Sequence, residues 1–266
     1  MSMKVGRLCK RSLSVSDHSR YKTKFCQNVI FKYDLKSRNW SIVTTSPIPR
    51  HDARMLATHE ALYILGGCDP LDDTPLPLKE SYKFIFRDEE WIPLPPMIHA
   101  RSLHAAVVFN NMILVIGGKD EENKILSSIE RYDAFKNRWE EYIPLPEPRM
   151  AMGVVACRDT VWVAGGITSV GDNITLVDSV WCFEANRGNW FKTFKLPKPL
   201  AFPTLLCDGG QLMCVGGAVR VKKGETYILE SVEDIYCFDD KKEMKWKKGA
   251  LMPLKCHNAV ASISGI

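Results

Sequence analysis

Four Gly-Gly pairs recur along the chain at nearly constant spacing, and this repetition constrains the fold more than any other feature. The pairs lie at residues 66–67, 117–118, 165–166 and 216–217. A run of apolar residues precedes each pair, as Met112–Ile116 does before Gly117. A period near fifty residues predicts one small sheet per unit. Because such a sheet cannot bury both of its faces alone, the units must stack against one another.

Tryptophans recur in phase with the glycine pairs. They lie at residues 40, 91, 139, 190 and 246. An aromatic residue followed by Asp precedes three of them, at Tyr33, Tyr132 and Phe238. The interval from Gly217 to Trp246 is the longest, which predicts an insertion in the fourth unit. Together these marks predict an all-β propeller of four-stranded antiparallel blades, in which the glycines and tryptophans are architectural.

The repeat also divides the chain. We expect a basic N-terminal tail at residues 1–24 and a propeller at residues 25–266. Complete repeats are predicted at about 50–100, 101–148, 149–199 and 200–254. Residues 25–49 resemble the two outer strands of a further blade, and residues 255–266 resemble an innermost strand. These remnants could complete a five-bladed ring, or the chain could be a fragment of a six-bladed parent.

Composition excludes several classes of protein. The formal net charge of +5 is small for a dedicated nucleic-acid binder, no apolar stretch is long enough for a membrane span, and the N-terminus is too polar for a secretory signal. The nine cysteines include no Cys-x-x-Cys pair, so we expect buried free thiols and a cytoplasmic location, with zinc ligands or disulfides as alternatives. No cofactor or metal site is predicted.

The glycine pairs and in-phase tryptophans resemble the kelch repeats of the BTB–kelch (kelch-like) proteins, over about residues 25–266. In that family, BTB and BACK domains engage cullin-3, and the propeller presents a substrate for ubiquitination. The resemblance implies a protein-binding module that recognises substrates for a cullin-3 ubiquitin-ligase adaptor. Only about two dozen residues precede the first strand remnant, so we expect the BTB and BACK domains to be missing from this chain. Cullin-3 would then be engaged only through a longer product.

By the same resemblance, partners bind the loops that lead into each inner strand and the loops that follow each Gly-Gly pair. The first set carries an in-phase basic residue at Arg50, Arg101 and Arg149, each 16 residues before the first glycine of a pair. Leu200 occupies the fourth position, and Lys255 is expected at the fifth. The predicted partner-binding residues are Arg50, His51, Arg101, Ser102, His104, Arg149 and Lys255. Guanidinium groups there favour an acidic or phosphorylated segment, unless each arginine only caps a turn or pairs with a neighbouring blade.

The loops after the glycine pairs differ in charge. Asp69, Asp72 and Asp73 follow the first pair, whereas Arg220, Lys222 and Lys223 follow the fourth. A partner of mixed charge therefore fits as well as an acidic one. Two other classes remain open, an actin-binding kelch protein and a propeller enzyme acting on sugars, although no catalytic motif occurs and no catalytic residue is predicted.

Overall fold

The computed structural model describes residues 28–34, 36–70, 75–171, 173–239 and 244–258. All regular secondary structure in these residues is β-strand, and the strands form antiparallel sheets. No helix in the described part of the chain is long and apolar enough to cross a membrane. The predicted N-terminal tail, residues 1–24, lies outside the described residues.

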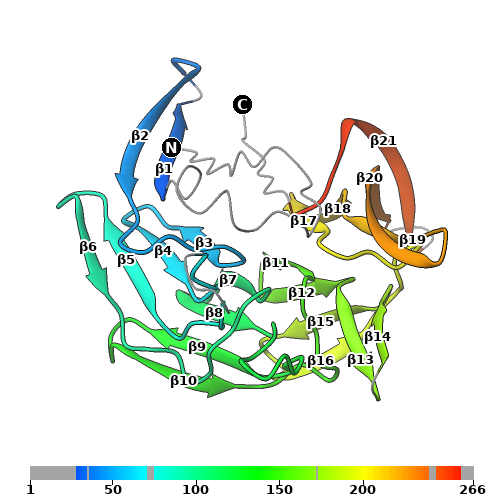
Figure 1. Ribbon diagram of the computed structural model, residues 1–266, viewed down its shortest axis with the longest axis horizontal. Coiled ribbons are helices and arrows are strands. Elements are labelled where there is room, and N and C mark those ends of the chain that lie inside the picture. Colours follow the sequence, from blue (N-terminus) through cyan, green and yellow to red (C-terminus); the bar gives the residue numbers. More distant parts are fainter. Residues whose placement is uncertain (1–27, 35, 71–74, 172, 240–243, 259–266) are drawn as a thin grey trace.

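Three sheets of four strands and one of five stand side by side around a common centre (Figure 1). The first blade contains β3 (Arg54–Ala57), β4 (Ala61–Leu65), β5 (Ser81–Ile85) and β6 (Glu90–Pro93). The second contains β7 (Ala105–Phe109), β8 (Met112–Ile116), β9 (Ile129–Asp133) and β10 (Arg138–Tyr142). The third contains β11 (Gly153–Cys157), β12 (Thr160–Ala164), β15 (Val180–Glu184) and β16 (Asn189–Lys192). The fourth contains β17 (Thr204–Asp208), β18 (Gln211–Val215), β20 (Thr226–Asp239) and β21 (Lys245–Cys256). The predicted all-β propeller is confirmed.

Three short pieces complete the set of strands. The pair β1 (Val29–Asp34) and β2 (Asn39–Thr45) packs on the first blade through Ile30, which contacts the buried cluster around Leu62 and Phe84. The third blade carries the hairpin of β13 (Ile167–Val170) and β14 (Asn173–Leu176). In the fourth blade, β19 (Ala218–Lys223) pairs with the first half of β20, which is the predicted insertion.

The strand before each glycine pair is buried because it lies between the faces of neighbouring blades. In β8, for example, Val115 and Ile116 have no exposed surface. The glycines that follow adopt positive φ, as Gly66 does at +53°. A Cβ on Gly66 would lie 2.6 Å from the carbonyl oxygen of Arg101 in the next blade. Only glycine allows the two blades to approach this closely.

Trp91 donates its indole N–H to the hydroxyl of Thr44. Each of the next three in-phase tryptophans joins two blades in two ways. Within its own blade it stacks on an aromatic residue of the neighbouring strand, with ring centroids 5.2 Å apart for Tyr132 and Trp139. Toward the preceding blade its indole N–H donates to a carbonyl oxygen, as Trp139 does to Pro95 at 2.9 Å. Trp190 and Trp246 repeat both contacts. The tryptophan therefore fixes the orientation of neighbouring sheets as well as filling space between them.

Near the start of each inner strand, a chain of backbone hydrogen bonds connects successive blades. Leu103 donates to Asp52, Ala151 to Leu103, Phe202 to Ala151, and Asn258 to Phe202, with N···O distances of 2.6–3.2 Å. All five residues have φ between +51° and +54° although none is glycine. Since non-glycine residues rarely adopt this conformation, the inter-blade hydrogen bonds must offset its strain.

One prediction about the cysteines is wrong. Cys157 and Cys207 form a disulfide, whereas free thiols were the favoured expectation and disulfides an alternative. Cys157 is the last residue of β11, and Cys207 is the last but one of β17 in the neighbouring blade; these inner strands contact each other. Cys182 and Cys214 are free and buried, as expected.

The two ends of the arc bear on the number of blades. Strands β1 and β2 form the first end, and β21, which stops at Cys256, forms the other (Figure 1). The predicted innermost strand at residues 255–266 falls mostly outside the described residues. The choice between a five-bladed ring and a fragment of six blades therefore stays open.

Candidate partner-binding face

Two sets of loops are joined into one surface, which we call the loop face. It consists of the segments that lead into each inner strand and the segments that connect the second and third strands of each blade. Paired backbone hydrogen bonds join one residue of each set in every blade. The joined residues are His51 with Cys68, Ser102 with Lys119, Met150 with Ile167, and Ala201 with Ala218. The structure therefore brings together the two loop sets that the sequence singled out.

The three in-phase arginines make the same contacts in three blades. Each guanidinium donates to the carbonyl oxygen of the first glycine of its pair and to the carbonyl oxygen just before the third strand. For Arg50 these acceptors are Gly66 at 2.8 Å and Glu80 at 2.7 Å. Arg101 and Arg149 donate to the equivalent carbonyl oxygens. The constant spacing of 16 residues thus reflects an internal bond that holds the base of each loop.

Burial limits what the predicted partner-binding residues can contact. Four of them have no exposed surface, and these are Arg101, Ser102, His104 and Arg149. Arg50 and His51 are partly exposed, and Lys255 is exposed. Arg101 and Arg149 are therefore internal supports of the loop face, and among the seven predicted residues only Arg50, His51 and Lys255 reach its surface. Partner contact at any of the seven stays a prediction.

In the second blade the arginine also meets a carboxylate. Arg101 and Glu130 form an ion pair in which neither side chain is exposed. The two oxygens of Glu130 also accept the backbone N–H groups of Ile98 and His99, at 2.7 and 3.0 Å. Burial lowers the pKa of Arg101, and the charge of Glu130 opposes that shift. The pair thereby anchors the segment that enters the inner strand β7.

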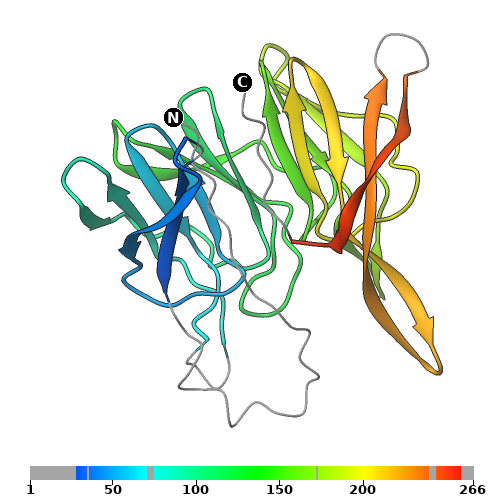
Figure 2. The ribbon, with the colours of Figure 1, turned by 90° about the horizontal axis from the view of Figure 1, so that it is seen from above.

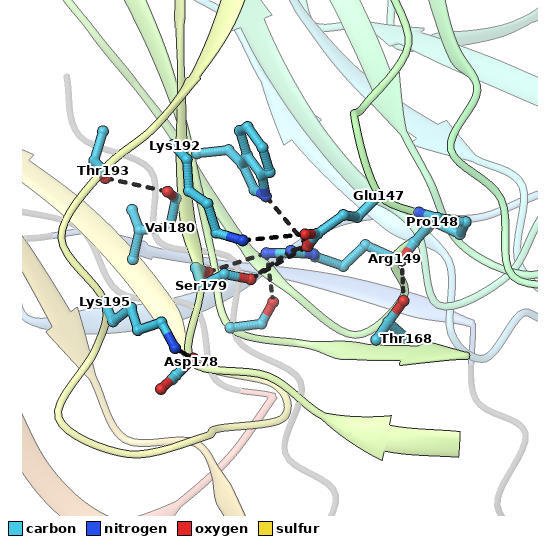
Figure 3. A network of polar contacts seen from close by, with 12 residues as sticks. Glu147, Pro148, Arg149, Thr168, Asp178, Ser179, Val180, Lys192, Thr193 and Lys195 are labelled. Carbon is cyan, nitrogen blue, oxygen red and sulfur yellow. Dashed lines mark hydrogen bonds and ion pairs between the residues drawn. The ribbon is translucent and has the colours of Figure 1, made fainter. Parts of the chain in front are cut away.

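In the third blade the carboxylate comes from the loop itself. Glu147 accepts a hydrogen bond from Arg149 at 2.8 Å, and Lys192 lies 3.3 Å from its other oxygen (Figure 3). Burial would raise the pKa of Glu147, but the hydrogen bond from Lys192 and the charge of Arg149 hold that pKa below its usual value. Thr168 of β13 donates to the carbonyl oxygen of Pro148 at 2.7 Å. The network therefore ties the β13–β14 hairpin to the loop that carries Arg149.

The fourth blade inverts these charges. Leu200 replaces the arginine and is fully buried. Lys198, two residues earlier, donates to Asp234 at 2.5 Å, and Lys248 lies 2.7 Å from the other oxygen of that carboxylate. Hydrogen bonds from the two lysines lower the pKa of Asp234. The cation thus comes from the loop position that Glu147 holds one blade earlier, and the carboxylate comes from the residue of β20 just before its pairing with β18 begins.

The expected fifth in-phase position needs a correction. The backbone N–H of Gly217 donates to Cys256 at 2.9 Å, as the second glycine of each earlier pair does to the in-phase residue of the following blade. Cys256, and not Lys255, is therefore the fifth equivalent. The ammonium group of Lys255 lies 3.8 Å from the carboxylate of Glu230.

The three histidines of this face do not converge. His51 lies 2.9 Å from Asp52, His257 lies 2.7 Å from the hydroxyl of Ser231, and His104 is buried. Among the described residues, no group of three or more His, Cys, Asp or Glu side chains could hold a metal ion. Burial, followed by the charges of Arg101 and Arg54, lowers the pKa of His104 far below its usual value, so this imidazole is neutral.

The sequence did not predict that two hairpins of the loop face would line one hollow. They are the β13–β14 hairpin and the hairpin that β19 forms with the first half of β20. A hollow of about 240 Å³ lies between them, lined by Thr175, Leu176, Lys198, Pro199, Val219 and Arg220. The long interval between Gly217 and Trp246 signalled the insertion, but nothing in the sequence indicated that a hollow would lie beside it.

The repeated contacts agree with a family comparison. The family model described as the Attractin/LZTR1 beta-propeller matches residues 19–257. The chain belongs to this family. A solved structure titled "Structure of YjhT" superposes on it with a TM-score of 0.76 at 18% sequence identity, over 88% of this chain and 80% of that one. That likeness shows the shared propeller fold.

Curated relatives connect the propeller with kelch-type proteins. The chain is 29% identical to beta-scruin of Limulus polyphemus over 87% of its length and 26% of that protein. It is 27% identical to Kelch-like protein 41b of Danio rerio over 82% of its length and 35% of that protein. The chain thus spans about a quarter to a third of these relatives, and what the whole proteins do reaches it only as a proposal.

Proposed function

We propose that this propeller is a protein-recognition module that binds its partner through the loop face. The observation that supports this is that the repeated residues bond within the scaffold, whereas the parts that differ between blades lie in the loops. The in-phase arginines, glycines and tryptophans are engaged in bonds within and between blades. The two hairpins and the other loops are the parts that differ between blades, and a rigid scaffold that carries variable loops is a typical binding architecture.

The kelch resemblance suggests a more specific role. In kelch-like adaptors the propeller selects the substrate, and a separate BTB-containing region engages cullin-3. We propose that this chain supplies the recognition part of such an adaptor in the cytoplasm. Purified cullin-3 is then expected to bind a product that includes a BTB region and not the isolated propeller.

Actin binding is the second candidate. The basic side chains Arg220, Lys222 and Lys223 are exposed on the β19–β20 hairpin and would suit an acidic filament. Co-sedimentation with purified actin filaments tests this directly. Pelleting above the filament-free control, lost when the three cations are changed to Glu, would favour the cytoskeletal role over the adaptor.

The loop face is tested by comparing three immobilised proteins. One is the unchanged chain, one has residues 219–230 replaced by a short glycine-containing turn, and one carries Phe135→Ser. Phe135 is fully exposed in the outer turn between β9 and β10, so it serves as a matched surface control. We expect cellular proteins identified by mass spectrometry to be retained by the unchanged and Phe135→Ser chains and lost from the hairpin variant. Equal retention on all three would contradict binding through the loop face.

A further inference from the structure

The β19–β20 hairpin extends the fourth blade beyond its own sheet. β20 is 14 residues long, and only its second half pairs with β18 and β21. Its first half pairs with β19 and projects from one face of the propeller (Figure 2). The guanidinium of Arg220 lies 4.0 Å from the ring centroid of Tyr227, which braces the two strands. The hairpin is therefore an ordered arm and not a loose loop.

Two strand edges face the hollow beside this arm. Among the described residues, β19 forms a ladder only with β20, and β14 only with β13. Thr175 and Leu176 of β14 line one side of the hollow, and Val219 and Arg220 of β19 line the other. A strand edge of this kind can pair with an extended segment of another chain.

The charges beside the arm indicate which kind of segment would bind there. The hollow between β14 and β19 is lined by two cations, Lys198 and Arg220, and by no carboxylate. A second hollow, which shares Val219 with the first, is lined by Glu230, Glu233 and Asp234 with one cation, Lys255. A basic hollow and an acidic one therefore adjoin the arm, and an acidic ligand is favoured only in the basic one.

Further residues reinforce this selection. Lys198 already bonds Asp234, so Arg220 is the main cation available to a ligand. Lys222 and Lys223 lie farther out on the same strand and are exposed. Val219 and Leu176 add an apolar wall at the base of the hollow. An extended segment with carboxylates on alternate residues and small aliphatic side chains between them matches this pattern of charge and apolar surface.

We propose that the edge of β19 accepts an acidic, aliphatic segment of a partner protein as an added strand in the basic hollow. This proposal rests on the proposed function and names the class of segment that the loop face recognises. Backbone pairing with β19 gives the ligand its extended form. Arg220 and Lys222 give its preference for carboxylates.

Synthetic peptides test the proposal with the whole chain. The probe is a fluorescein-labelled peptide of alternating Glu and Val, and its binding is followed by fluorescence anisotropy at low salt. We expect a saturable signal that weakens at least tenfold in the Arg220→Glu, Lys222→Glu variant. The Lys36→Glu, Arg38→Glu variant is the matched control, because it makes the same charge change in the exposed turn between β1 and β2. Its binding should be unchanged.

A second peptide tests the backbone pairing without altering the protein. N-methylation of alternate residues removes N–H donors and keeps the charges. We expect at least a tenfold loss with this peptide, and no binding by a peptide of alternating Lys and Val. Equal binding by the methylated peptide, or by the Arg220→Glu, Lys222→Glu variant, would overturn the proposal. Displacement of the acidic peptide by a single-stranded oligonucleotide would also overturn the proposal, because the site would then recognise phosphate groups.

The outcomes separate this proposal from the proposed function. If the acidic peptide does not bind, but the hairpin replacement still releases cellular proteins, the added-strand proposal fails and recognition by the loop face stands. If neither the binding of the peptide nor the retention of cellular proteins responds to changes in the hairpin, both proposals fail. Thermal unfolding of each variant checks that the propeller is intact. We expect the unfolding temperatures of the two charge variants to be unchanged, because their substituted side chains are exposed.

Discussion

Arg101 and Glu130 form an ion pair that is sealed completely inside the second blade. Removing one partner of such a pair leaves an uncompensated buried charge, which typically costs 3–5 kcal/mol. We therefore expect Arg101→Leu to lower the free energy of unfolding by about that amount. The measurement is urea denaturation followed by tryptophan fluorescence.

The fourth blade suggests how this loss can be reversed. There Leu200 occupies the arginine position and is fully buried. We expect the double variant Arg101→Leu, Glu130→Leu to be more stable than Arg101→Leu alone, because no buried charge remains unpaired. Lys136→Ala is the control, since its ammonium group is half exposed and its removal should change stability by less than about 1 kcal/mol. A double variant less stable than the single one would contradict the buried-charge explanation.

The tryptophan contacts make a second prediction. Trp139→Phe removes the hydrogen bond to Pro95 and part of a buried ring, so it should cost about 1–3 kcal/mol of unfolding free energy. Trp40 occupies the equivalent position in the β1–β2 pair but is 52% exposed, and Trp40→Phe should cost clearly less. Equal losses of unfolding free energy in the two variants would show that burial between blades does not determine how much this tryptophan stabilises the fold.

The repeat could be predicted because its physical causes are visible in the chain. A glycine pair after an apolar run and a tryptophan in constant phase are needed wherever one blade approaches the next. These residues predicted the blades and the insertion in the fourth one. Spacing failed at Lys255 because the pairing of β20 with β21 shifts register between Val232 and Tyr236, and a residue count cannot detect such a shift.

The site was less predictable, for a different reason. Phase showed that Arg50, Arg101 and Arg149 are equivalent, but phase does not give the direction in which a side chain points. Their acceptors are backbone carbonyl oxygens, which carry no signature in the sequence. The hollow beside β19 depends on two hairpins from different blades, so no local pattern could reveal it. The disulfide did leave a signal, because its cysteines are one repeat apart.

That disulfide makes a third prediction. Cys157 and Cys207 are separated by 50 residues, and closing a loop of that length stabilises a fold by about 4 kcal/mol in the chain-entropy treatment. We expect dithiothreitol to lower the unfolding temperature of the unchanged chain. The Cys157→Ala, Cys207→Ala variant should start lower and show no response to the reductant. An unchanged chain that is insensitive to dithiothreitol would argue against the bond.

His104 makes the last prediction, which concerns pH. Its folded pKa lies far below the usual value of 6.5, mainly because the ring is buried and also because Arg101 and Arg54 are close. Below pH 6.5 the unfolded chain therefore takes up a proton at this histidine that the folded chain does not, and stability falls as the pH falls. The loss is expected to reach about 1.4 kcal/mol between pH 7.5 and 5.5. His104→Leu should remove this part of the pH dependence, so its stability relative to the unchanged chain should rise by that amount over the same interval. His59→Leu is the control, because it removes an exposed histidine in place of a buried one. Parallel profiles for the His104 variant and the unchanged chain would show that folding does not lower the pKa of this imidazole.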